Sequence, residues 1–226
     1  MGTVNRRLAT DLRDQLGLRR AVETGTFWGV TARSLAALFD SVVTIELSAS
    51  LHARATTALR DLPQVETVHG HSVVALSTIA RSDISTLYFL DGHWSGGVTE
   101  GVEDECPVIE EIVAIGAGHP DDCLIIDDAR LFTSAPSPML DAAQWPTIIE
   151  VFDAIRYQRP DHIVTLIADQ VIAVPQRAKP AIDAHGARVL NTYGARLHAK
   201  VVALRGAALT SLAAVRTRLG HHGVRP

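Results

Sequence analysis

The alternation of short apolar runs with amphipathic segments constrains the fold of this chain more than any other feature. Runs rich in β-branched residues recur up to residue 128, and segments with helical spacing of apolar residues lie between them. Five runs are expected to be strands: residues 21–29 with their glycine turn, 41–48, 65–72, 85–91 and 121–128. Strands that alternate with helices form a mostly parallel sheet covered on both faces. The predicted fold class is therefore α/β and doubly wound.

Segments outside this alternation complete the predicted architecture. Residues 8–18 carry leucines at helical spacing, so an amphipathic helix is expected near the N-terminus. Residues 162–175 resemble two strands around a tight turn, which predicts an antiparallel strand pair at the C-terminal edge of the sheet. Several prolines predict an irregular loop or lid between residues 131 and 150. We assign residues 1–176 to one domain and 177–226 to a helical extension, packed on that domain or partly mobile.

Composition places the chain among globular proteins. Of its 226 residues, 47% are hydrophobic and 20% are charged, and its formal charge of −4 does not favour nucleic acid as a partner. Its two cysteines, Cys106 and Cys123, are too few for a disulfide scaffold and are expected to be reduced thiols. The sequence has no apolar run of the ~20 residues needed to span a bilayer, and its start lacks a secretory signal. We therefore expect a cytoplasmic protein without a membrane partner.

Polar residues follow each of the five predicted parallel strands. In open α/β sheets, ligands bind outside the carboxyl ends of the strands, so these residues are expected to meet at one edge. In chain order, the exits carry Glu23-Thr24-Gly25, Glu46, Gly70-His71-Ser72, Asp91-Gly92-His93 and Asp127-Asp128. Five polar exits in succession predict a binding or catalytic site at this edge.

The first two exits favour recognition of a nucleoside. Gly25 permits a tight turn, and Gly29 lets the backbone approach closely where the next helix begins. Glu46 lies 21 residues beyond Gly25, where a carboxylate can bind both hydroxyls of a ribose. Phe27 occupies the place of the second glycine of GxGxxG, and no GK[ST] is present, so a nucleoside without a phosphate chain fits better. A plain turn and a solvated strand end would explain the same residues.

Four segments carry a resemblance to a known family. ETGTFWG (23–29), TIELS (44–48), LDGHWSGG (90–97) and LIIDDAR (124–130) stand in the order and spacing of class I S-adenosylmethionine-dependent methyltransferases. The chain more closely resembles the metal-dependent, macrocin-type O-methyltransferases of sugars and natural products. The likeness covers residues 20–135 and implies a Rossmann-like methyltransferase sheet.

The resemblance implies that S-adenosylmethionine (SAM) is the cofactor. Its binding residues would be Glu23, Thr24, Gly25, Thr26, Gly29, Glu46, His71, Ser72 and Asp91. Within this set, Glu46 would hold the ribose hydroxyls, and Ser72 with His71 would lie at the edge of the adenine. His71 departs from the acidic residue expected beside Ser72, which makes the adenine contacts less typical of the family.

The resemblance also implies a metal and a base. Asp91, Asp127 and Asp128 match the carboxylates that hold Mg²⁺ in this family, and His93 stands at the place of the general base, so His93 and Asp91 form the predicted catalytic pair. Three carboxylates suit a hard cation, Mg²⁺ or Mn²⁺, which lowers the pKa of a bound hydroxyl. A histidine near pKa 6.5 can then remove the proton at neutral pH. Taken singly, these residues could equally be helix caps or loop residues.

The predicted function is O-methyl transfer from SAM to a hydroxyl of a sugar or small metabolite, which would be the partner molecule. A metal-dependent hydrolase could use the same Asp and His residues without needing Glu46 or the glycine turn. A nicotinamide-dependent oxidoreductase is disfavoured by the missing second glycine. A catalytically inactive nucleoside-binding protein is a further alternative. A homodimer is compatible with the sequence, which does not identify the acceptor.

Overall fold

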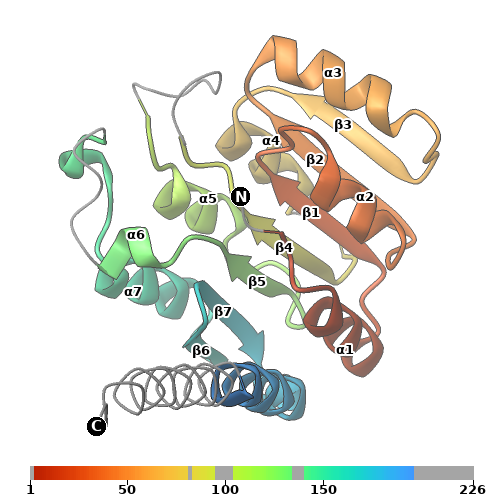
Figure 1. The fold of residues 1–226 in the computed structure, drawn as a ribbon. Helices are drawn as coiled ribbons and strands as arrows, with labels where there is room; N and C mark the ends of the chain where they lie inside the picture. Colours follow the sequence, from red (N-terminus) through yellow and green to blue (C-terminus); the bar gives the residue numbers. More distant parts are fainter. Residues whose placement is uncertain (1–2, 81–82, 95–103, 134–139, 196–226) are drawn as a thin grey trace, which may run out of the picture. The chain divides into compact units, whose positions relative to one another are not determined.

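The computed structural model describes residues 3–80, 83–94, 104–133 and 140–195 (Figure 1). The chain divides into two compact units, residues 1–183 and 184–226. Residues 179–195 are helical, while the rest of the predicted helical extension lies outside the described residues. None of the helices in the described ranges is both long and apolar enough to cross a membrane.

A seven-stranded sheet forms the centre of the first unit. Its strands are β1 (Arg20–Thr24), β2 (Ser41–Glu46), β3 (Val65–His69), β4 (Thr86–Leu90), β5 (Cys123–Ile126), β6 (His162–Ile167) and β7 (Gln170–Pro175). The strand order is β3-β2-β1-β4-β5-β7-β6. The first five strands pair in parallel, whereas β7 pairs antiparallel with both β5 and β6. The predicted doubly wound sheet with an antiparallel pair at its C-terminal edge is confirmed.

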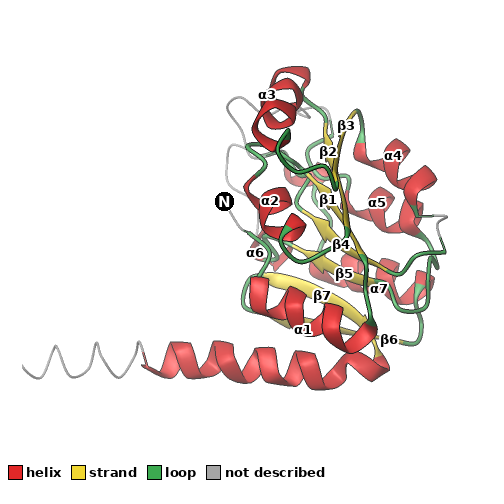
Figure 2. Ribbon diagram, turned by 90° about the vertical axis from the view of Figure 1, so that its right-hand side faces the viewer, coloured by secondary structure: helices red, strands yellow, loops and turns green. Residues whose placement is uncertain are grey.

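Helices cover both faces of this sheet (Figure 2). They are α1 (Arg6–Leu16), α2 (Val30–Ala36), α3 (Ala49–Leu59), α4 (Ser72–Ile79), α5 (Val108–Ile115), α6 (Arg130–Thr133) and α7 (Ile148–Gln158), with short 3₁₀ turns η1 (Ala142–Gln144) and η2 (Gln176–Ala178). Helices α1, α2 and α3 lie on one face, and α4, α5 and α7 lie on the other. The predicted opening helix is present, with the Asn5 side chain accepting the Leu8 N–H at its N-terminus (3.0 Å).

Alternate residues of each central strand supply the two layers of the core. In β4, Leu87 and Phe89 face the layer that contains the leucines of α1, while Tyr88 and Leu90 face the layer with α5 and α7. Because both faces are covered, the central strands are apolar almost throughout. Polar groups are therefore concentrated where these strands end. Both cysteines are free and buried.

The segment after β5 differs from the predicted irregular loop. It begins with the short helix α6, and η1 follows at residues 142–144, while residues 134–139 lie outside the described ranges. The Leu131 N–H donates to the Asp128 carbonyl (2.9 Å), and the Asp141 side chain accepts the Ala143 N–H (3.0 Å). Local capping bonds of this kind order short helical turns that hydrophobic periodicity does not reveal.

Candidate active site

A cavity of about 420 Å³ opens at the carboxyl ends of β1, β2 and β4, within the ~300–1,000 Å³ typical of small-molecule sites. Seven of the nine predicted cofactor residues line it: Glu23, Gly25, Thr26, Glu46, His71, Ser72 and Asp91. His93 and Asp128 line it as well. The topology thus brings the exits of five strands to one site, as the switch-point rule predicts.

Gly25 allows the ends of β1 and β4 to approach each other. Its φ is +83°, and a Cβ placed there would lie 2.2 Å from the carbonyl oxygen of Asp91. The N–H groups of Gly25 and Thr26 both donate to the Ile45 carbonyl, at 2.9 and 3.2 Å. Any larger residue would push apart the two backbones that form the cavity floor.

The two predicted cofactor residues outside the cavity lining support its walls. Thr24 is fully buried, and its hydroxyl accepts the N–H of Asp91 at 3.3 Å. Gly29 precedes α2, and a Cβ there would lie 3.0 Å from the side chain of Leu59 in α3. Gly29 therefore lets these helices pack closely.

Two backbone N–H groups hold the carboxylate of Glu46. Phe27 N–H donates to one oxygen at 2.8 Å, and Ser48 N–H donates to the other at 2.9 Å. The Glu46 side chain is therefore fixed at the cavity wall, while each oxygen retains a lone pair for a further donor. Phe27 has a φ of +47°. It is not among the cofactor residues predicted from the sequence, because it contributes a backbone N–H, which side-chain identity does not reveal.

Glu23 is a buried acid beneath the same wall. Its carboxyl accepts the Thr44 hydroxyl at 2.6 Å, and the Thr44 hydroxyl lies 2.6 Å from that of Thr26. Burial raises the pKa of Glu23 to about 8, and the charge of Glu46 adds to this effect, while hydrogen bonds from Thr44 oppose it. Glu23 is therefore largely protonated near neutral pH and can donate a hydrogen bond.

His71 and Ser72 form the wall at the start of α4. The Nδ1 of His71 accepts the Val73 N–H at 3.4 Å, and its Nε2 lies 3.1 Å from Oδ2 of Asp104. Beneath Ser72 lies Glu111, a residue that sequence reasoning did not select. Burial raises the pKa of Glu111 to about 7, although a hydrogen bond with the Ser72 hydroxyl lowers it in part.

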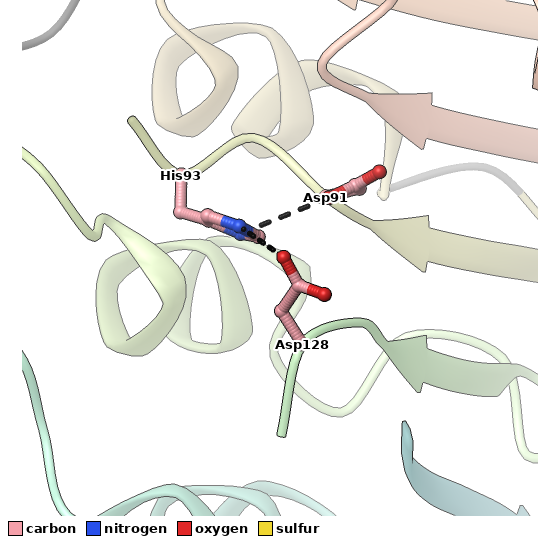
Figure 3. A group of neighbouring side chains, drawn as sticks. All are labelled: Asp91, His93 and Asp128. Carbon is pink, nitrogen blue, oxygen red and sulfur yellow. Dashed lines mark hydrogen bonds and ion pairs between the residues drawn. The ribbon is translucent and has the colours of Figure 1, made fainter. Parts of the chain in front are cut away.

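Asp91, His93 and Asp128 form a cluster where β4 and β5 end (Figure 3). In the sheet these strands lie on the other side of β1 from β2, which carries Glu46. One ligand atom from each residue lies within 4.8 Å of the other two. His93 Nε2 is 3.0 Å from Asp128 Oδ2, and His93 Nδ1 is 3.8 Å from Asp91 Oδ1. The His93 side chain is only 8% exposed, so its orientation is set by these neighbours.

The two carboxyls of this cluster differ in acidity. Burial raises the pKa of Asp91 to about 8; the charges of Asp127 and Asp128 add to this, and His93 opposes it. The hydrogen bond from His93 lowers the pKa of Asp128 to about 2, with a further contribution from Arg130. Arg130 Nη1 lies 2.6 Å from Asp128 Oδ1 and also contacts Asp169. Asp128 is therefore the ionised member near neutral pH.

Asp127, the third predicted metal ligand, has a different environment. Its Oδ1 accepts the side-chain N–H of Gln170 at 3.0 Å. Its Oδ2 is buried and has no hydrogen-bond partner within the described ranges. The structure thus groups Asp91 and Asp128 with His93, and Asp127 is not part of that group of three.

The residues present fit a hard divalent cation. Such ions prefer several oxygen ligands, and a buried carboxylate oxygen without a partner is a suitable one. The charges of Asp127 and Asp128 raise the pKa of Asp91, and the charge of Asp128 raises the pKa of Asp127, so the three carboxyl groups interact. A cation here would share Asp128 with His93 and Arg130, which already contact its two oxygens.

Comparison with solved structures identifies the fold. The chain is similar to a putative caffeoyl-CoA O-methyltransferase from Staphylococcus aureus, with a TM-score of 0.55 and 15% sequence identity. The match covers 77% of this chain and 84% of that protein. The chain also matches an O-methyltransferase of tomaymycin synthesis from Streptomyces achromogenes, solved with SAM, over 77% and 81% (20% identity, TM-score 0.53). The chain has the same fold as these two O-methyltransferases. An O-methyltransferase from Bacillus cereus with bound SAH matches over 78% and 82% (17% identity, TM-score 0.53). No protein-family model and no curated protein matches the chain significantly.

Proposed function

We propose that this protein transfers a methyl group from SAM to a hydroxyl oxygen of a small molecule. One observation carries the proposal: a single cavity is lined by Glu46 on one side and by Asp91, His93 and Asp128 on the other. The first side suits a nucleoside and the second suits deprotonation of a hydroxyl. A hydrolase would need the second side alone.

SAM would lie along the wall from β1 to α4. Glu46 would accept hydrogen bonds from the ribose hydroxyls through the lone pairs that its two backbone donors leave open. Glu23, Gly25 and Thr26 would contact the methionine part, and His71 with Ser72 the adenine. The related structures from S. achromogenes and B. cereus, which contain SAM and SAH, support this assignment.

The transfer needs an acceptor for one proton. The hydroxyl oxygen attacks the methyl carbon, the carbon–sulfur bond breaks with its electron pair remaining on sulfur, and SAH leaves as a neutral thioether. We assign the hydroxyl proton to Nδ1 of His93. Asp128 accepts the Nε2–H of the same ring, which selects the tautomer whose Nδ1 carries a lone pair.

A divalent cation, Mg²⁺ or Mn²⁺, would be held by Asp91, Asp127 and Asp128. When bound, it would lower the pKa of the acceptor hydroxyl. The assignment is supported by the raised pKa of Asp91 and by the Oδ2 of Asp127, which has no hydrogen-bond partner among the described residues. Arg130 also contacts Asp169, so it would keep a carboxylate partner if Asp128 bound the cation.

The acceptor is proposed to be a sugar or a small natural product. This rests on the resemblance of the strand-exit motifs and on the tomaymycin-synthesis enzyme among the similar structures. Residues 1–176 would form the catalytic domain, and residues 177–226 its helical extension.

Calorimetric titration with S-adenosylhomocysteine, with and without Mg²⁺, tests the proposal. We expect micromolar binding by the wild-type protein and a loss of about 10- to 100-fold in Glu46→Gln, because a hydrogen bond to a charged group contributes ~1.5–3 kcal/mol. Glu66→Gln, the same change at an exposed position of β3, is the control and should bind normally. Absence of binding by the wild type would overturn the proposal and favour the hydrolase, which metal-dependent hydrolysis of a nitrophenyl phosphate ester would then test.

A further inference from the structure

A buried acid outside the cavity, Glu105, links three segments near His93. Its side chain is almost fully buried at 3% exposure. One carboxylate oxygen accepts both the indole N–H of Trp145 (2.8 Å) and the backbone N–H of Asp141 (2.9 Å). Its backbone N–H donates to Gln144 Oε1 (2.9 Å), and its carbonyl accepts the Trp94 N–H (2.7 Å).

One of these contacts holds the ring of Trp145, which lies against His93. The two ring centroids are 5.5 Å apart and the planes are inclined by 66°, an edge-to-face arrangement. The Phe132 ring also packs near the indole, with the two ring centroids 6.1 Å apart. Trp145 is not among the residues that line the cavity, whereas His93 is. The indole therefore forms the wall behind the imidazole.

Placing a carboxylate there is costly unless it does something that an apolar residue could not. A buried acid needs hydrogen-bond donors, and one oxygen of Glu105 accepts two of them, from residues 141 and 145. An apolar residue would pack against the indole equally well, but it would not fix the rotation of that ring. The directional bond to Nε1 determines which edge of the indole meets His93.

We propose that Glu105 is a positioning residue for His93, acting through the hydrogen-bonded indole of Trp145. The indole restricts rotation of the imidazole, so Nε2 stays directed at Asp128 and Nδ1 remains available for the acceptor proton. The same bonds hold residues 141–145 over the back of His93 and exclude water from that side. The role of His93 as the base rests on the proposed function. The orientation of its ring does not.

Nitrogen NMR of the histidine ring tests this orientation without any substrate. Long-range ¹H–¹⁵N spectra at about pH 8, where an ordinary histidine is neutral, distinguish the two tautomers. The His93 signals are those that disappear in His93→Gln. We expect a single Nε2–H tautomer in the wild type and a mixture of tautomers in Glu105→Leu, which has no acceptor for the indole. Glu105→Gln keeps one acceptor oxygen and should lie closer to the wild type.

Two further variants keep the test decisive. Trp145→Phe retains a ring but removes the bonded N–H, and it replaces Glu105→Leu if that variant does not fold. Glu110→Leu makes the same change at an exposed position of α5 and should leave the His93 signals unchanged. Unaltered His93 signals in both Glu105→Leu and Trp145→Phe would overturn the inference.

Binding and turnover separate this inference from the proposed function. The Glu105 and Trp145 variants should bind S-adenosylhomocysteine within about threefold of wild type, a change of less than ~0.7 kcal/mol. Their turnover should fall by up to about 100-fold, the cost of a small misplacement of a reacting group. If the wild type bound no S-adenosylhomocysteine but the variants showed the expected change of tautomer, the proposed methyltransferase function would be wrong. The positioning role of Glu105 would still hold.

Discussion

The two sides of the cavity are built by different means. The nucleoside side, residues 23–29 and 46–48, holds Glu46 with backbone N–H groups from adjacent turns. The acidic side, residues 91–93 and 127–130, depends on side chains that meet across separate strands and on supports from residues 141–145 and 168–170. Backbone donors survive most substitutions, whereas side-chain partners do not. The acidic side should therefore be the more sensitive to single substitutions.

The largest effect is expected at Asp128. Asp128→Asn removes the charge that orients His93 and pairs with Arg130, so methyl transfer should fall by about 10²- to 10⁴-fold. Asparagine suits the left-handed backbone at this position (φ +55°), whereas alanine would add strain. Turnover and S-adenosylhomocysteine affinity are measured together, with Asp153→Asn on the exposed face of α7 as the control. Wild-type turnover in Asp128→Asn would show that the acidic side does not carry the chemistry.

Gly25→Ala should cause the next largest effect, this time on the nucleoside side. The added Cβ would lie 2.2 Å from a backbone oxygen at a positive φ, so the free energy of unfolding should fall by about 3 kcal/mol or more. Gly17→Ala is the matched control, because it has a positive φ (+71°) but no atom within 4 Å of the new Cβ. That control should lose about 1 kcal/mol in urea denaturation. Equal losses in the two variants would mean that backbone approach at Gly25 is unimportant.

Titration of Glu23 should make stability depend on pH. Its pKa is raised from 4.5 to about 8 by folding, so the protonated form is favoured in the native state. Its contribution to stability is then complete below pH 4.5 and is lost as the pH rises toward 8. Across this window the unfolding free energy of wild type should fall relative to Glu23→Gln by up to about 1.4 kcal/mol per pH unit. Parallel stability curves for the two proteins would contradict the buried, neutral acid.

The smallest effect is expected for Ser48→Ala. Glu46 uses the backbone N–H of Ser48 and not its hydroxyl, so S-adenosylhomocysteine affinity should change by less than about threefold. Ser48→Pro removes that N–H at a φ of −73°, which proline accepts, and should weaken binding by about tenfold. Calorimetry on this pair isolates the backbone contribution. A larger loss in the alanine variant than in the proline variant would reverse the comparison.

Much of the fold could be predicted from the sequence because central strands of a parallel sheet are buried on both faces. Their apolar runs, such as 85–91 and 121–128, stand out against the helices. The turn at Ala168 and the hairpin around it were also predictable. The structure of residues 131–133 and 140–150 was not predictable, because it depends on capping bonds and on the buried contact of Trp145 with Glu105.

The location of the candidate site could be predicted from the sequence, but the contacts between its side chains could not. Strand exits locate Glu46, Asp91 and Asp128 at one edge by topology alone. Which of two adjacent acids faces the cavity depends on the turn after β5, where Asp128 adopts a left-handed backbone and Asp127 points to Gln170. No periodicity in the sequence specifies such a turn.

The supports of the acidic side come late in the chain, which has a consequence for biosynthesis. Every described residue that lines the cavity has been translated by Arg130, yet Trp145, Asp169 and Gln170 follow up to forty residues later. Domains fold as the ribosome releases them from the N-terminus. On a nascent chain the nucleoside side can therefore assemble first. His93 gains its contact with Trp145, and Asp127 its bond from Gln170, only after those later residues have left the exit tunnel.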